Sequence, residues 1–183
     1  MPSTSSMTAS PGLSLQANRD DLRIAGFAAL AIVIHLAESA LPTPLPGFKP
    51  GFANIISLYV LLAYGWRMAA WVSLLRVLGG SLLLGTFLSP TFMLSLSGAL
   101  ASLAVLAVSI HLPGRPFGPV GHSCLAALAH MSGQFFAAYS LFMPHPALLL
   151  LLPVLLTAAL LSGIVGGIIT HKVMQQMQEM RST

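Results

Sequence analysis

Six hydrophobic runs alternate with short polar or proline-containing stretches along the 183-residue chain. A helix that crosses a bilayer needs about 20 mostly apolar residues, and five of the runs approach this length. The second run is shorter, so its helix is expected to be tilted, re-entrant or extended into the preceding loop. The expected helices lie at residues 23–41, 51–65, 67–86, 91–111, 120–143 and 147–170. The pattern predicts an all-α integral membrane protein with six transmembrane helices in one bundle.

The composition agrees with a chain that lies mostly in lipid. It is 56% hydrophobic and only 7% charged, with a mean hydropathy of +0.86, whereas soluble domains carry about 25% charged residues. The net charge of +4 comes from basic residues scattered between the hydrophobic runs. Because these residues do not gather into a basic patch, a nucleic-acid partner is not expected. Membrane lipid is the expected surrounding.

The basic residues also predict the orientation, because cytoplasmic loops hold an excess of lysine and arginine. With six spans, Lys49 stands alone on one side. The other side holds Arg19, Arg23, Arg67, Arg115, Lys172 and Arg181. If the second run did not span, the same residues would divide two to five, a poorer fit. We therefore predict six spans with both termini in the cytoplasm.

Three parts of the chain follow from this topology. Residues 1–22 are rich in Ser, Thr and Pro at their start and are predicted to be a disordered cytoplasmic segment. Residues 23–171 form the membrane domain, and residues 172–183 form a short cytoplasmic tail. The stretch LPTPLPGFKPGF, residues 41–52, falls outside the membrane, and its prolines and glycines exclude regular helix. It is either a shaped lid or a plain connector between two helices.

One basic residue, Arg76, falls near the centre of a predicted span. A charged side chain at the centre of a bilayer costs at least about 2.5 kcal/mol, so it normally faces protein or water and has a partner. The expected partner is Glu38, the only acidic residue within any predicted span. Two interpretations remain open. The pair could simply fix the packing of two helices, or Arg76 could form the floor of an outward-facing pocket that binds a ligand.

Other polar residues can join Arg76 in such a pocket. His35 and Glu38 are three residues apart, and His130 and Gln134 are four apart, so each pair shares one face of a helix. The candidate substrate-binding residues are Arg76, Glu38, His35, Lys49, Asn54, His130 and Gln134. Alternatively, the polar residues of the fifth helix make interhelical hydrogen bonds only. A metal site built from His35, Glu38 and His130 is disfavoured because the ligand spacing is loose, and neither a metal nor a cofactor is expected.

Three stretches resemble a known family: PGFKPGFANIISL (residues 46–58), GWRMAAWVSLLRVLGGSLLLGTFLSPTFMLSLSGALASL (65–103) and GHSCLAALAHMSGQ (121–134). They resemble the Gx transporter family, also labelled heptaprenyl diphosphate synthase component I. That family looks like the S components, the substrate-binding membrane subunits of energy-coupling factor transporters. The resemblance implies a bacterial cytoplasmic (inner) membrane and a ligand site near the outer face. Pro50 replaces an apolar residue of the family pattern, which leaves the shape of the loop open.

The resemblance also implies partners. S components dock on a coupling transmembrane subunit through a small-residue face of the first helix, here Ala25 and Ala29, and ATPase subunits supply the energy. The chain itself has no G-x-x-x-x-G-K-[ST] motif and is not expected to be an enzyme. The leading hypothesis is a subunit that captures a small, anionic, vitamin-like molecule, or a flavin or prenyl-type molecule, for uptake.

The alternative is a non-catalytic membrane subunit of a prenyl diphosphate synthase or of a membrane redox assembly. Prenyl transfer from diphosphates requires clustered carboxylates to hold Mg²⁺, which prefers oxygen ligands. This chain offers only Asp20 and Asp21, which are adjacent and lie outside the predicted spans. It could not carry out that reaction alone.

Overall fold

A computed structural model describes residues 18–40, 52–111 and 117–182, and these residues form helices and short turns. Six α-helices occur at the six predicted places, which confirms the all-α prediction. They are α1 (Arg19–Ala40), α2 (Phe52–Tyr64), α3 (Trp66–Leu83), α4 (Pro90–His111), α5 (Pro119–Ala137) and α6 (Leu152–Ser182). A π-helical turn, η1 (Ala138–Phe142), and a 3₁₀ helix, η2 (Pro146–Leu151), connect the last two.

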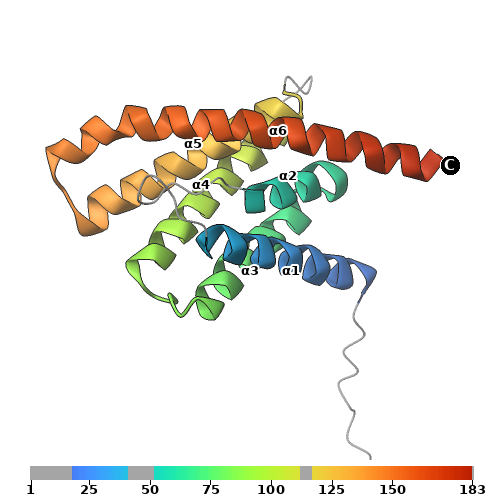
Figure 1. Cartoon of the computed structure of the whole chain (residues 1–183), viewed down its shortest axis with the longest axis horizontal. Coiled ribbons are helices and arrows are strands. Elements are labelled where there is room, and N and C mark those ends of the chain that lie inside the picture. The colour runs from blue at the N-terminus through green and yellow to red at the C-terminus, as the bar shows by residue number, and fades with distance from the viewer. Residues whose placement is uncertain (1–17, 41–51, 112–116, 183) are drawn as a thin grey trace, which may run out of the picture.

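The helices pack mainly against their neighbours in sequence (Figure 1). Helix α5 lies between α4 and α6, while α1 packs against α3 and α2. Small residues allow the closest approach: a Cβ atom at Gly167 of α6 would lie 2.6 Å from the Cα of Val120 in α5. Close approach at small residues is the usual way in which membrane helices gain packing energy. Gly167 thus allows α5 and α6 to approach closely.

Helix α2 is short and lies inside the bundle. It has 13 residues, and it contacts α1, α3, α5 and α6. Leu58 and Val60 are fully buried, together with Ala31 of α1 and Val72 of α3. Helix α2 therefore forms the centre of the hydrophobic core.

Three helical segments are long and apolar enough to cross a bilayer by themselves: residues 19–40, 90–111 and 146–180. In addition, α2 contributes a shorter apolar segment, residues 54–64. Many of the large exposed side chains of α1 and α6 are apolar, among them Val33, Leu161 and Val165. Such outward apolar surfaces suit a lipid environment. The complete six-span topology and the cytoplasmic position of both termini remain predictions.

The helix ends differ from the predicted ones at both termini. Helix α1 begins at Arg19, within the segment predicted to precede the membrane domain. Helix α6 has 31 residues and continues to Ser182 through the predicted tail. At a rise of about 1.5 Å per residue, it is about 46 Å long, and its last part extends past the other helices (Figure 1). Residues 1–17 lie outside the described residues.

The turn between α3 and α4 brings two helices into antiparallel contact. Gly85 has a φ of 66°, a left-handed conformation that glycine adopts without steric penalty. A Cβ atom there would meet no atom within 4 Å, so Gly85 shapes the turn and does not serve helix packing. Ser89 then precedes Pro90, and its hydroxyl accepts a hydrogen bond from the Phe92 amide at 3.4 Å. This is the usual combination at a helix start.

Candidate functional site

A cavity of about 440 Å³ lies at one end of the bundle, and all six α-helices contribute to its wall. It lies where α1, α3 and α5 end and where α2, α4 and α6 begin. Cavities of about 300–1,000 Å³ are typical of sites for small organic ligands. The position and the volume make this cavity the candidate binding site.

Six of the seven predicted binding residues line this cavity. They are His35, Glu38, Asn54, Arg76, His130 and Gln134. The seventh, Lys49, lies outside the described residues, as does most of the predicted lid. Ser39 and Asn54, which flank this segment in the sequence, both line the cavity. The chain thus leaves and re-enters the bundle beside the cavity.

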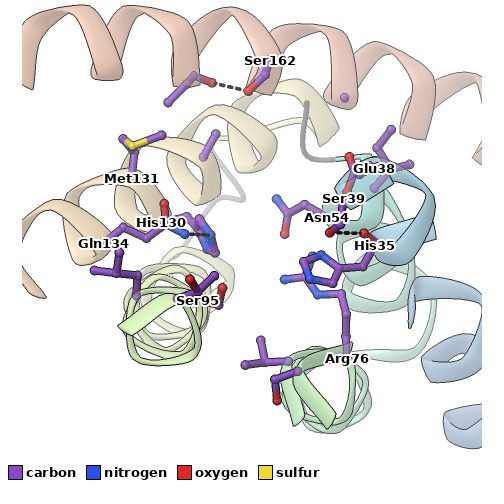
Figure 2. A pocket seen from close by; sticks show the side chains of 18 of the residues that line it. His35, Glu38, Ser39, Asn54, Arg76, Ser95, His130, Met131, Gln134 and Ser162 are labelled. Carbon is purple, nitrogen blue, oxygen red and sulfur yellow. Dashed lines mark hydrogen bonds between the residues drawn. The ribbon is translucent and has the colours of Figure 1, made fainter. Parts of the chain in front are cut away.

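Figure 2 shows that the polar side chains form two opposite groups. Arg76, His35 and Asn54 lie on one side, contributed by α3, α1 and α2. His130, Gln134 and Ser95 lie on the other side, contributed by α5 and α4. We call the first group the charged wall and the second group the neutral wall.

Arg76 is the central residue of the charged wall. Its side chain is buried, with 7% of the residue surface exposed. Its Nε atom is fully buried without a hydrogen-bond partner, and no hydrogen bond joins its guanidinium to any residue that the structure describes. A buried donor without a partner is costly, and a buried charge even more so. Arg76 lines the cavity, and the described residues leave its hydrogen-bonding capacity unused.

Glu38 is close enough to act on Arg76 electrostatically. The expected direct ion pair is absent, however, because the one ion pair within the described parts of the chain joins Arg23 to Asp20. Glu38 is itself buried, with 4% of its surface exposed. The carboxylate thus reduces the cost of burying the guanidinium through space and leaves the N–H groups of Arg76 unpaired.

His35 owes its position beside Arg76 to a glycine on the neighbouring helix. A Cβ atom at Gly80 would lie 2.8 Å from the Cδ2 atom of His35. The imidazole ring therefore occupies the place that a side chain of α3 would otherwise fill. On α1 itself, the hydroxyl of Ser39 donates a hydrogen bond to the main-chain oxygen of His35 at 2.7 Å.

The neutral wall depends on a hydrogen bond within α5. The Nε2 atoms of His130 and Gln134 are 3.1 Å apart, as their spacing of four residues predicts. A Cβ atom at Gly98 would lie 2.8 Å both from the His130 ring and from the Cγ atom of Gln134. Gly98 of α4 therefore provides the space for both side chains. Nothing in the sequence distinguishes this glycine from the other glycines of the hydrophobic runs.

Several hydroxyl and apolar residues of the cavity were also missed. The additional polar lining residues are Ser39, Ser81, Thr86, Thr91, Ser95, Ser123 and Ser162. The hydroxyl groups of Ser81 and Ser162 donate hydrogen bonds to main-chain oxygens of their own helices, as serines in membrane helices commonly do. Nothing in the sequence separates them from other serines. Val77, Phe92 and Met131 provide part of the apolar surface.

Other predicted features lie away from the cavity or form no site. Ala25 and Ala29 are exposed on α1, and a Cβ atom at the neighbouring Gly26 would meet nothing within 4 Å. The described residues include no group of three His, Cys, Asp or Glu side chains suited to a metal ion. Cys124 is a free, half-buried thiol.

Comparison with known proteins gives one family. No curated protein and no solved structure matches the chain. The family described as Heptaprenyl diphosphate synthase component I matches residues 27–173, which include every described residue of the two walls. The match covers well over half of the sequence. The chain is therefore a member of the heptaprenyl diphosphate synthase component I family, as its sequence motifs predict.

Proposed function

We propose that this protein is the substrate-binding membrane subunit of an energy-coupling factor type transporter. In this function, the cavity captures a small, vitamin-like organic molecule at the outer face of a bacterial inner membrane. Flavin-type and prenyl-type molecules are the chemical classes to test first. The predicted topology supports this direction of uptake, because it puts the cavity end of the bundle outside.

The observation that carries the proposal is the unpaired guanidinium of Arg76 within a cavity lined by six helices. A residue that only fixes helix packing is expected to use its hydrogen bonds on other helices. Arg76 makes no such bond with the described residues, although the missing bond at its buried Nε atom is costly. A bound cargo molecule would supply the missing acceptors.

The partners in this proposal are a coupling transmembrane subunit and ATPase subunits. The exposed Ala25 and Ala29 of α1 offer a face of small side chains to which a partner helix can pack closely. ATP hydrolysis must come from the partners, because the sequence contains no phosphate-binding loop motif. After capture, a tilt of the subunit on its partner would release the cargo inside, as the resemblance to S components implies.

The family description favours one second candidate, a non-catalytic membrane subunit of a prenyl diphosphate synthase. Asp20 and Asp21 are exposed at the first turn of α1, and neither lines the cavity. The chain thus lacks a carboxylate cluster at its cavity for Mg²⁺-bound diphosphate. In that function it would anchor or regulate a catalytic partner.

One purification distinguishes these functions. The tagged full-length chain is extracted gently from its own membranes, and its partners and small molecules are identified by mass spectrometry. Transport predicts recovery of a membrane coupling subunit, of ATPases with phosphate-binding loops and of a retained small molecule. Recovery of a prenyl diphosphate synthase whose activity depends on this chain would support the second candidate, and recovery of a redox complex without cargo would contradict both.

A further inference from the structure

The geometry of the two walls points to a cargo with two distinct ends. We propose that the cargo carries a single anionic group, bound by Arg76, and a neutral hydrogen-bonding group, bound by Gln134 and His130. This inference rests on the proposed function and narrows its substrate class. It favours organic monoanions, such as carboxylates, over diphosphates and over uncharged molecules.

The charge of the lining argues for one anionic group. Within the described part of the chain, the cavity is lined by one arginine, Arg76, and one carboxylate, Glu38, and by no lysine or aspartate. A guanidinium can pair with one carboxylate through two parallel hydrogen bonds. A diphosphate would bring several negative charges to a site whose described lining holds one arginine and a nearby carboxylate. Unpaired charges are strongly disfavoured in such a buried site.

The unpaired state of Arg76 argues against an uncharged cargo. Its fully buried Nε atom and its lack of a bonded partner leave a charge that is only partly compensated by Glu38. A neutral carbonyl group would satisfy a hydrogen bond but not the charge. Hydrogen bonds between charged partners are about twice as strong as those between neutral ones. An anionic group is therefore the ligand that gains most from this position.

The opposite wall is suited to a neutral group. The cavity residues contributed by α4 and α5 include no Asp, Glu, Lys or Arg. A glutamine side chain has an acceptor oxygen and two N–H donors. The Nε2 atom of Gln134 is hydrogen-bonded to Nε2 of His130 at 3.1 Å. Its carbonyl oxygen and second N–H remain for a ligand. Amide-like or ring-nitrogen groups match this combination of donor and acceptor.

Gly98 sets the specificity of this neutral subsite. Its missing side chain leaves the space that the His130 ring and the Gln134 side chain occupy, at 2.8 Å from the position of a Cβ atom. Both side chains are thereby held against α4 and face the charged wall across the cavity. Between the walls, Val77, Phe92 and Met131 provide apolar surface for the body of the molecule. We infer that Gly98 determines where the neutral end of the cargo binds.

The test uses purified full-length protein and a panel of aromatic and alicyclic probes. Each probe is prepared as a carboxylate, a primary amide and a diphosphate ester, and binding is measured by calorimetry and by thermal stabilisation. We expect some carboxylates to bind at least about tenfold more tightly than their amides, the effect of one charge-assisted hydrogen bond. The matching diphosphates are expected to bind no more tightly than the carboxylates.

Variants assign the preference to the two walls. Arg76→Gln should remove the carboxylate preference, and Arg76→Lys should keep it in weakened form, because lysine keeps the charge but not the planar pair of donors. Gln134→Ala should weaken all bound carboxylates that carry a neutral polar end. Equal binding of amides and carboxylates, tighter binding of diphosphates, or no binding by any member of the panel would each overturn the inference.

The inference and the proposed function fail in different ways. If the protein co-purifies with a coupling subunit and ATPases but its retained cargo is neutral or a diphosphate, the transporter assignment stands and the inference is wrong. If carboxylates bind through Arg76 in a protein that associates with no ATPase, the inference stands and transport is wrong.

Discussion

Two arginines near the two ends of the bundle differ in how the protein treats their charge. Arg23, near the start of α1, forms an ion pair with Asp20 at 3.2 Å and lies 5.4 Å from the centre of the Tyr64 ring. It is exposed. Arg76 is buried at the cavity and has no bonded partner in the described structure. The described fold gives Arg23 an ion-pair partner and an aromatic ring. It gives Arg76 no hydrogen-bond acceptor.

The largest expected effect follows from Arg76→Gln. Loss of one charge-assisted hydrogen bond should lower cargo affinity about 10- to 150-fold, since such a bond is worth about 1.5–3 kcal/mol. Thermal melting of the cargo-free protein is measured alongside, because the variant also removes the positive charge that lies near the buried Glu38 carboxylate. Calorimetry with the retained cargo and thermal melting in detergent measure the two effects. A large loss of stability with unchanged cargo affinity would show that Arg76 serves helix packing and does not bind the cargo.

The second prediction concerns the glycine behind the neutral wall. Gly98→Ala adds a methyl group at a site 2.8 Å from His130 and Gln134, so both side chains must shift. We expect cargo affinity to fall about tenfold, comparable to the loss of one good hydrogen bond. Gly26→Ala is the matched control, because nothing lies within 4 Å of its added methyl group. Equal affinities for the two variants would contradict the role of Gly98.

A smaller effect is expected for Gln134→Ala. The variant removes one neutral hydrogen-bonding group, worth about 0.5–1.5 kcal/mol, so affinity should fall about 2- to 10-fold. The exposed pair of His171 and Gln175 on α6 has the same spacing and the same 3.1 Å separation. Gln175→Ala should therefore leave affinity unchanged. Titration of both variants with the same cargo makes the comparison.

The smallest effect is expected for Arg23→Gln. Exposed ion pairs contribute about 0–1 kcal/mol, and an exposed cation–π contact contributes about 0.5–1 kcal/mol. Stability should fall by no more than this sum, and cargo affinity should not change. A loss of affinity similar to that of Arg76→Gln would remove the contrast between the two arginines.

The sequence was sufficient to predict the helices and the charged, histidine and amide residues of the cavity lining, but not its hydroxyl residues. Long apolar runs identify helices because few other structures satisfy the backbone in lipid. Polar residues inside those runs stand out for the same reason, so His35, Glu38 and Arg76 could be grouped by helix position alone. Six of the seven candidates line one cavity, and Lys49 lies outside the described residues.

Other features depend on distances between helices and left no signal in the sequence. The cavity role of Gly98 arises because α4 and α5 approach closely there, and a glycine in a membrane helix has many other uses. The predicted ion pair between Glu38 and Arg76 requires a contact distance that sequence position cannot give. The extension of α6 to Ser182 was missed because its last turns are polar and leave the apolar pattern.

An experimental structure of the gently purified protein with its retained cargo would test the central claim most directly. The account predicts an acidic group of the cargo within about 3 Å of the Arg76 guanidinium nitrogens. A neutral polar group of the same molecule should contact Gln134. A guanidinium enclosed by protein side chains, with the cargo bound elsewhere or with no cavity beside it, would contradict the account.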